Sequence, residues 1–177
     1  MLEEFTIPKD YRKSNLAPTD KELQWMFAVI RAQAKHGGNA LEMGAGVTSL
    51  VIQQAMEPAT HIAIEDFKQS IERLKPHVPQ PPRFGIFKTW DVFSKFQWDL
   101  AFIDSSVGGD PNNKNYQRHV ALMAVVPYLV KDALVIIHDW LHKGGKQSRL
   151  YLESKGWDLL DGCYDGMGVG VYRRPYA

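Results

Sequence analysis

Short apolar runs alternate with segments of helical periodicity from residue 39 onward. The apolar runs predict strands at 40–43, 61–65, 84–88, 99–103 and 133–138. Apolar residues at helical spacing predict helices near 47–57, 67–75, 116–130 and 146–155. This order is typical of βα units around a parallel sheet. The runs 100–103 and 133–137 are almost entirely apolar, so we expect both to lie in the centre of the sheet, covered on both faces.

The two ends of the chain follow other patterns. Thr19 and Glu22 form a potential capping box, and the apolar spacing after them predicts a helix that ends at Gly37-Gly38. After Gly156, two short apolar segments at 157–160 and 169–172 flank a stretch that contains glycine and aspartate, which predicts a closing hairpin. Pro127 is expected to kink or end the helix near 116–130.

Length and charge limit the classes of protein and partner. A chain of 177 residues that is 45% hydrophobic can bury one core, so we expect a single domain over 1–177, with an N-terminal extension and helix over 1–38 and a core over 39–177. With 21 basic and 20 acidic residues the net charge is +1, which favours a small-molecule partner over nucleic acid or a membrane. Cys163 is the only cysteine, so no intramolecular disulfide forms.

Location and assembly are predicted less directly. The start of the chain is acidic and has no signal-peptide pattern, and no apolar run approaches membrane-spanning length, so a cytoplasmic protein is expected. The oligomeric state stays open, with a homodimer among the states that the sequence allows.

The segment 41–49 places an acid and two glycines between a predicted strand and a predicted helix. Gly44 and Gly46 permit a tight turn and close approach of a ligand to the backbone at the helix start. Glu42 favours a ligand with an ammonium group or hydroxyls over a pyrophosphate. Ser49 stands where a dinucleotide-binding turn has its third glycine or alanine, which points away from a dinucleotide.

Acidic residues also follow the other predicted strands, at the edge where parallel α/β sheets bind ligands. Glu65, with Asp66 beside it, lies about twenty residues past the glycine turn, where a carboxylate can accept hydrogen bonds from ribose hydroxyls; the alternative is a helix N-cap. Asp91 is interpreted either as a contact of an adenine amino group or as the cap of a short helix.

Asp104, His138 and Asp139 stand at the ends of the two most apolar strands. The two carboxylates are predicted to line a substrate pocket or to share a divalent cation, and entry into a solvated loop is the alternative. His138 is either a general base or a structural histidine. Three aromatic residues near the same edge either line an acceptor pocket or pack in the core: Trp90, Trp140 and Tyr164. The loop 104–115 has Asn115 where an EF-hand has glutamate, so it is interpreted as a mobile element over the substrate or as a disordered surface loop.

The order of these parts resembles the class I S-adenosylmethionine-dependent methyltransferases from about residue 20 to the end of the chain. Residues 42–46 resemble the first motif of that family, and residues 98–104 resemble its fourth-strand motif. The resemblance implies an α/β fold, a Rossmann-like three-layer sandwich whose seven-stranded, mostly parallel sheet has the order 3-2-1-4-5-7-6 and an antiparallel last strand. Within the family, segments 102–104 and 136–139 look most like small-molecule O-methyltransferases.

The resemblance also implies a function and a set of site residues. The expected activity is methylation of a small-molecule hydroxyl, and the alternatives are a catalytically silent S-adenosylmethionine-binding module and an NAD-dependent oxidoreductase. Catalysis is assigned to Asp104, His138 and Asp139, and Mg²⁺ to Asp104 and Asp139, although Trp140 replaces the asparagine that follows the second metal ligand in the catechol type. The implied S-adenosylmethionine contacts are Glu42, Gly44, Ala45, Gly46, Thr48, Glu65, Asp66, Trp90, Asp91 and Asp104.

Overall fold

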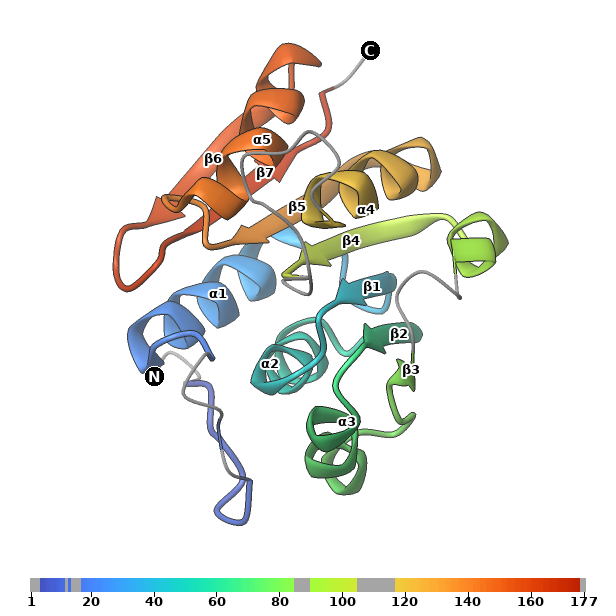
Figure 1. Ribbon diagram of the computed structural model, residues 1–177, viewed down its shortest axis with the longest axis vertical. Helices are drawn as coiled ribbons and strands as arrows, with labels where there is room; N and C mark the ends of the chain where they lie inside the picture. The colour runs from blue at the N-terminus through green and yellow to red at the C-terminus, as the bar shows by residue number, and fades with distance from the viewer. Residues whose placement is uncertain (1–3, 12, 14–16, 85–89, 105–116, 176–177) are drawn as a thin grey trace.

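The structure is a computed structural model, and it describes residues 4–11, 13, 17–84, 90–104 and 117–175. Helices and strands alternate along the chain up to α5, and β6 and β7 then follow each other directly (Figure 1). The α-helices are α1 (Asp20–Gln33), α2 (Val47–Met56), α3 (Lys68–Leu74), α4 (Gln117–Val125) and α5 (Lys143–Ser154). The strands are β1 (Asn39–Met43), β2 (Thr60–Glu65), β3 (Arg83–Phe84), β4 (Trp98–Ile103), β5 (Leu129–His138), β6 (Asp158–Cys163) and β7 (Val169–Arg173). Short 3₁₀ segments are η1 (Lys75–His77), η3 (Trp90–Lys95) and η4 (Val126–Tyr128).

The strands form one mixed sheet in the order β3-β2-β1-β4-β5-β7-β6. Six of them have five or more residues, and β3 adds two residues at one edge. Neighbouring strands from β3 to β5 pair in parallel, whereas β7 pairs antiparallel with both β5 and β6. The predicted Rossmann-like α/β fold with an antiparallel last strand is confirmed.

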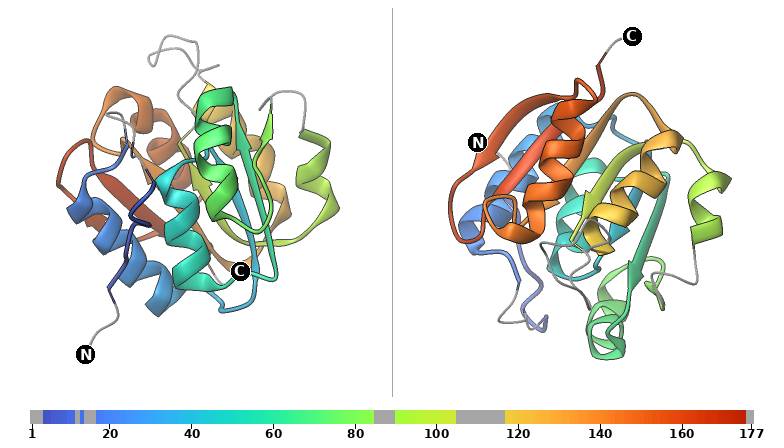
Figure 2. Two further views of the ribbon diagram at one scale, coloured as in Figure 1. Left: turned by 90° about the horizontal axis from the view of Figure 1, so that it is seen from below. Right: turned by 45° about the horizontal axis from the view of Figure 1, so that its top comes forward.

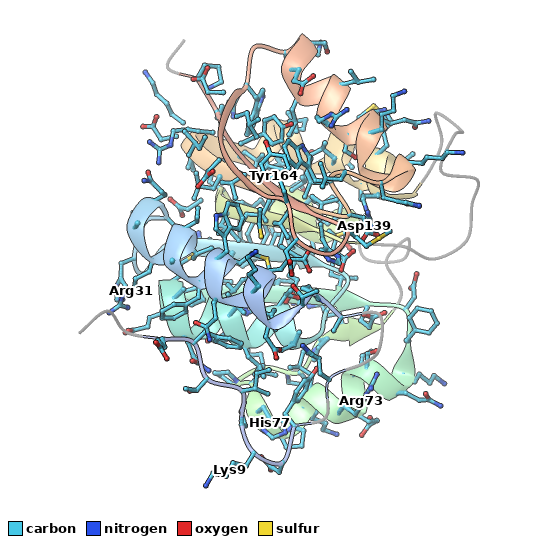
Figure 3. All side chains as sticks on the ribbon, turned by 90° about the vertical axis from the view of Figure 1, so that its left-hand side faces the viewer. Lys9, Arg31, Arg73, His77, Asp139 and Tyr164 are labelled. Carbon is cyan, nitrogen blue, oxygen red and sulfur yellow. The ribbon has the colours of Figure 1, made fainter. Side chains whose placement is uncertain are left out.

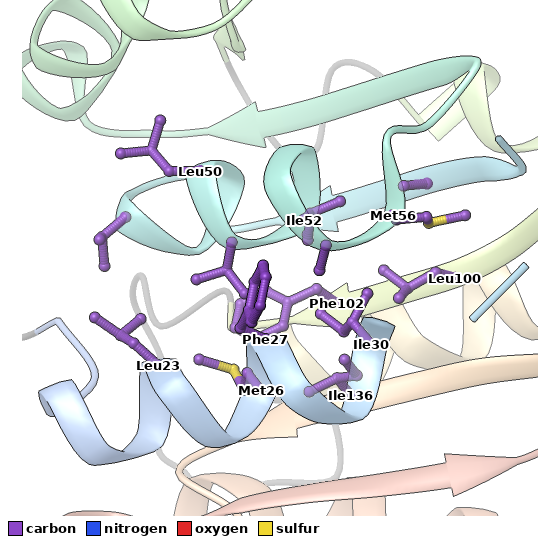
Figure 4. Packing of buried hydrophobic residues seen from close by; sticks show 14 of the residues in the cluster. Leu23, Met26, Phe27, Ile30, Leu50, Ile52, Met56, Leu100, Phe102 and Ile136 are labelled. Atoms are coloured by element: carbon purple, nitrogen blue, oxygen red, sulfur yellow. The ribbon is translucent and has the colours of Figure 1, made fainter. Parts of the chain in front are cut away.

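Helices cover both faces of this sheet (Figure 2). On one face, α1 and α2 bury apolar residues against β1, β4 and β5, as Figure 4 shows for Phe27, Ile52 and Phe102. On the other face, α4 and α5 pack on the alternate residues of the same strands, among them Ala101 and Val135. Since successive side chains of a strand point to opposite faces, this division accounts for the continuous apolar runs at 100–103 and 133–137.

The predicted capping box is confirmed at the start of α1. The Thr19 side chain accepts a hydrogen bond from the backbone N–H of Glu22, and the Glu22 carboxylate accepts one from the backbone N–H of Thr19. These bonds satisfy two backbone donors that the first turn of a helix leaves open.

Several predicted boundaries are wrong. The helix expected to reach residue 130 ends at Val125, because Pro127 cannot continue it, and β5 begins at Leu129 instead of residue 133. An irregularity in the pairing of β4 with β5 follows, with Asp132 at a φ of 64°. Helix α5 begins three residues before its predicted start, at the His142 cap. Of the strand predicted at 84–88, only Phe84 belongs to the described residues. None of the helices in these described ranges combines the length and the apolar character needed to cross a bilayer.

Candidate functional site

The parallel strands β2, β1, β4 and β5 end side by side, and the residues that follow them form a continuous rim. The register pairs Met43 of β1 with Ile64 of β2 and with Ile103 of β4, and it pairs Ile103 with Ile137 of β5. The backbone N–H of Asp104 donates to the Met43 carbonyl at 2.7 Å, which holds Asp104 beside the glycine turn. The register therefore brings the predicted cofactor turn and the predicted catalytic residues to one edge of the sheet.

The turn between β1 and α2 requires glycine at residue 44 and leaves open space beside residue 46. Gly44 has a φ of 94°, a conformation that L-residues rarely adopt, and its N–H donates to the Ile64 carbonyl at 2.8 Å. Gly46 caps α2 without a side-chain hydrogen bond, and a Cβ built on Gly46 would meet no atom within 4 Å. No atom of the described residues fills the space at Gly46, so a ligand can approach the backbone and the open N–H groups of the first turn of α2.

Glu42 does not face this space. Its carboxylate is fully buried and accepts hydrogen bonds from the hydroxyls of Thr48 and Ser49. His61 Nε2 lies 3.2 Å from the same carboxylate, and Gln53 contacts the other ring nitrogen. In this arrangement Glu42 and Thr48 fix α2 against the sheet, and their predicted contacts with a cofactor stay predictions.

Glu65, at the end of β2, has features of a helix cap and features of a ribose-binding carboxylate, the two interpretations that its sequence position allowed. Its Oε1 accepts hydrogen bonds from the backbone N–H groups of Asp66 and Phe67, at 2.7 and 2.9 Å, just before α3. No donor among the described residues bonds to Oε2, which leaves that oxygen for ribose hydroxyls. Burial, at 6% exposure, raises the pKa of Glu65 to about 7 despite the two backbone donors.

Asp91 is placed differently. It lies in the 3₁₀ segment η3, its side chain is 70% exposed, and Lys95 Nζ lies 3.1 Å from its carboxylate. Lys95 lowers the pKa of Asp91. A short helix is therefore present, but Asp91 lies in its first turn and not at its cap, and the adenine contact stays a prediction. The side chain of Trp90 and the loop 105–115 lie outside the described residues.

The predicted catalytic residues meet at the ends of β4 and β5. His138 Nδ1 lies 3.1 Å from Asp104 Oδ2 and 3.4 Å from Asp139 Oδ1. Both carboxylate side chains are partly exposed, at 20% and 22%, whereas His138 is buried. Asp139, labelled in Figure 3, directly follows β5 and has a φ of 53°. The two aspartates can thus reach a ligand from the rim.

His138 is surrounded by carboxylates on both sides. Its Nε2 lies 3.9 Å from Glu22 Oε2, and the Glu22 carboxylate also accepts from the backbone N–H of Gly168. Burial lowers the pKa of His138, but Asp104, Glu22 and Asp139 outweigh it and raise this pKa to about 10. An imidazole with this pKa holds its proton at neutral pH, so this environment does not suit the general base predicted for His138.

Arg118 is a central residue that the sequence interpretation missed. Its guanidinium is fully buried, with Nη2 at 2.8 Å from Asp104 Oδ1 and 3.0 Å from Asp139 Oδ2. Nη1 donates to the His138 backbone carbonyl at 2.9 Å. A signal was present, because Arg118 lies on the buried face of α4 at helical spacing from Ala121, Leu122 and Val125. A charge on the apolar face of a helix indicates a buried partner.

Mg²⁺ does not fit this arrangement. Asp104, His138 and Asp139 each offer one ligand atom, and these atoms lie within 4.8 Å of one another. The two carboxylates predicted to share the ion, however, already share the guanidinium of Arg118. A hard cation needs direct contact with such oxygens at about 2.0–2.6 Å.

The aromatic residues near the rim differ in their surroundings. Trp140 is buried, its Nε1 donates to the Tyr172 hydroxyl at 3.0 Å, and its ring fills the space above Gly162 and Gly170. Core packing, one of the two predicted roles, therefore holds for Trp140. Tyr164, labelled in Figure 3, lies in the turn between β6 and β7 and is 70% exposed. Its ring contacts the Trp140 ring edge-on, with 5.3 Å between the centroids.

No family model and no curated protein matches the chain. Solved structures do. A Staphylococcus aureus protein assigned as a caffeoyl-CoA O-methyltransferase matches with a TM-score of 0.70 at 15% identity, over 90% of this chain and 85% of that one. The precorrin-6y C5,15-methyltransferase of Geobacter metallireducens matches at 0.66 and 15%, over 92% of each chain. The N-methyltransferase NodS of Bradyrhizobium japonicum, in complex with S-adenosyl-L-homocysteine, matches at 0.64 and 10%, over 96% and 94%.

These matches and the strand order define the fold: the chain has the Rossmann-like α/β fold of S-adenosylmethionine-dependent methyltransferases. The predicted resemblance to the class I methyltransferases is confirmed at the level of the fold. The structures that share it are named for acceptor atoms of different kinds, so the fold leaves the acceptor open.

Proposed function

We propose that the chain is an S-adenosylmethionine-dependent methyltransferase that methylates a hydroxyl of a small molecule. One observation carries the proposal. The glycine turn and Glu65 lie on the same rim as Asp104 and Asp139, so cofactor and acceptor can meet at the ends of neighbouring strands.

The features of the cofactor half support a nucleoside with an amino-acid tail. The space at Gly46 admits a ligand against the backbone, and Glu65 Oε2 can accept hydrogen bonds from ribose hydroxyls. S-adenosylmethionine, when bound, supplies a methyl group that its sulfonium already activates. The chain therefore has to hold the acceptor in line and remove its proton.

The features of the acceptor half support this task. Asp104 and Asp139 present partly exposed carboxylate oxygens to the rim, and a carboxylate can accept the hydrogen bond and then the proton of a hydroxyl. Asp139 is assigned as the base. His138 and Arg118 contact both carboxylates from the buried side, so we assign them as positioning residues.

Separate observations support the proposal that the acceptor is a small molecule and that its methylated atom is a hydroxyl oxygen. The Staphylococcus aureus structure is named for O-methylation, and the segments around Asp104 and Asp139 resemble small-molecule O-methyltransferases. The net charge of +1 gives no attraction to a polyanion, in agreement with a small-molecule partner.

The test is transfer of a labelled methyl group from S-adenosylmethionine to a panel of small hydroxylated acceptors. We expect Asp139→Asn to lower kcat by about 100-fold or more, with S-adenosylhomocysteine affinity within about twofold of the unsubstituted protein. Asp158→Asn, an exposed change on β6, is the matched control. Unchanged turnover in Asp139→Asn would remove Asp139 from catalysis.

Methyl transfer, together with binding of S-adenosylhomocysteine and of NAD, also distinguishes the two alternative functions. Cofactor binding without transfer to any acceptor would support the silent S-adenosylmethionine-binding module. Binding of NAD in place of S-adenosylhomocysteine would support an oxidoreductase.

A further inference from the structure

The ends of β4 and β5 carry an internal cation. Asp104 and Asp139 are the two carboxylates from which the sequence predicts a divalent metal site. In the structure, one guanidinium nitrogen of Arg118 bridges them, at 2.8 and 3.0 Å. The second terminal nitrogen is bonded to the His138 carbonyl at 2.9 Å, which fixes the plane of the guanidinium.

The position of Arg118 is determined by the fold. Its side chain is fully buried, and it projects from the same face of α4 as Ala121, Leu122 and Val125, which pack on the sheet. Arginine keeps its charge in proteins, so the guanidinium is a permanent cation. A buried cation of this kind cannot move into solvent without leaving its carboxylates unpaired.

A divalent ion and Arg118 exclude each other. An ion that contacted Asp104 Oδ1 and Asp139 Oδ2 would have to displace Nη2 from these oxygens. An ion that contacted the other two oxygens, which lie 3.1 and 3.4 Å from His138 Nδ1, would still be held by the carboxylates that Nη2 bridges, and the guanidinium would repel it. The exclusion follows from the placement of Arg118 and applies with or without an acceptor.

We propose that Arg118 is the resident cation of this site and that it takes the place of a divalent metal. The part that concerns catalysis rests on the function proposed above. A metal ion would bind an acceptor oxygen directly, whereas the buried guanidinium holds only the carboxylates. One hydroxyl that contacts Asp139 is therefore enough for an acceptor. The acceptor does not need a second, neighbouring oxygen, as it would if it had to chelate a metal ion.

The test uses Mn²⁺ alone as the probe, followed by its electron paramagnetic resonance signal. We expect the unsubstituted protein to bind no Mn²⁺ at this site at concentrations up to about 1 mM. Arg118→Met keeps an unbranched side chain but removes the charge, and it should bind Mn²⁺ at least about tenfold more tightly. Arg118→Lys keeps a cation and should bind as weakly as the unsubstituted protein.

Further substitutions locate the ion. Asp139→Asn added to Arg118→Met should abolish the new Mn²⁺ binding. If Arg118→Met does not fold, Mn²⁺ binding is compared between the unsubstituted protein and Asp104→Asn. Binding to the unsubstituted protein that is lost in Asp104→Asn would overturn the proposal. In Arg118→Met that does fold, unchanged Mn²⁺ affinity would overturn it as well.

Activity gives a separate result. Methyl transfer that persists in a chelator agrees with the proposal. Transfer that is lost in the chelator and restored by Mg²⁺ would overturn the resident cation and leave the proposed methyltransferase intact. Absence of any transfer would count against the proposed function, while the Mn²⁺ measurements would still decide the role of Arg118.

Discussion

At the scale of single residues, a substitution of Gly46 distinguishes an effect on the stability of the fold from an effect on ligand affinity. Its φ of −173° is accessible to any residue, and an added Cβ would meet no atom of the described part of the chain within 4 Å. We therefore expect Gly46→Ala to change the free energy of unfolding by no more than about 1 kcal/mol. The same methyl group occupies the space of the proposed ligand, so S-adenosylhomocysteine affinity should fall at least about tenfold. Calorimetry and urea unfolding of one preparation measure both quantities. Unchanged affinity would contradict the assigned ligand position.

Glu65 gives a prediction about pH. Its folded-state pKa of about 7 lies above the ordinary value of 4.5, because burial penalises the charged form. The folded state therefore binds the Glu65 proton more tightly than the unfolded state. The resulting stability is fully present below pH 4.5 and is lost as the pH rises through about 7.

The measurement is urea unfolding of the unsubstituted protein and of Glu65→Gln at several pH values. The stability of the unsubstituted protein relative to Glu65→Gln should fall by on the order of 3 kcal/mol between pH 4.5 and pH 8. The comparison with Glu65→Gln cancels the other titrating groups. A difference that does not change with pH would show that the Glu65 carboxyl is not desolvated.

Residue chemistry also explains which site residues the sequence could reveal. Asp104, His138 and Asp139 were predictable because parallel strands end at one edge: His138 is the last residue of β5, and Asp104 and Asp139 directly follow β4 and β5. Arg118 and Glu22 come from helices that pack on the two faces of the sheet, and their spacing marked them only as a buried-face charge and a capping residue. Helix spacing does not encode which strand end a long side chain reaches, so the partners of Arg118 required the structure.

At the scale of elements, the hairpin of β6 and β7 depends on small residues beneath Trp140. A Cβ on Gly162 would lie 2.8 Å from the Trp140 ring, and one on Gly170 would lie 2.7 Å from it. We expect Gly162→Ala to destabilise the fold by roughly 1–3 kcal/mol, because the buried indole, bonded to Tyr172, has little room to move. Gly46→Ala is the matched control, since it adds the same methyl group in open space. Equal unfolding midpoints for the two variants would show that the Trp140 ring yields without cost.

Element boundaries were predictable where local signals were strong. The capping box at Thr19 correctly located the start of α1, whereas the helix ends at Gln33, before the glycines at 37 and 38 that were predicted to end it. The predicted start of β5 was wrong, because residues 129–132 have no alternating pattern. They belong to the strand because Leu129 pairs with Trp98 of β4. Such pairing is a tertiary effect that local spacing does not contain.

At the scale of the whole molecule, separate parts of the chain converge on the rim. Helix α1 is tied to the turn of the closing hairpin, because Thr19 donates to Asp165 at 2.6 Å and Glu22 accepts from Gly168. The glycine turn and Glu65 come from the other half of the sheet. The fold class could be predicted because the order of βα units and a final hairpin allows few arrangements. The contacts that Glu22 of α1 and Arg118 of α4 make with residues of the rim could not be predicted.

The central claim is that this rim binds S-adenosylmethionine through the glycine turn and Glu65. Calorimetry with S-adenosylhomocysteine tests it most directly, on the unsubstituted protein, on Glu65→Ala and on the exposed α3 control Glu72→Ala. We predict binding at one site, an affinity at least about tenfold weaker in Glu65→Ala, and an affinity within about twofold in Glu72→Ala. No binding to the unsubstituted protein, or equal affinities in both variants, would contradict the account.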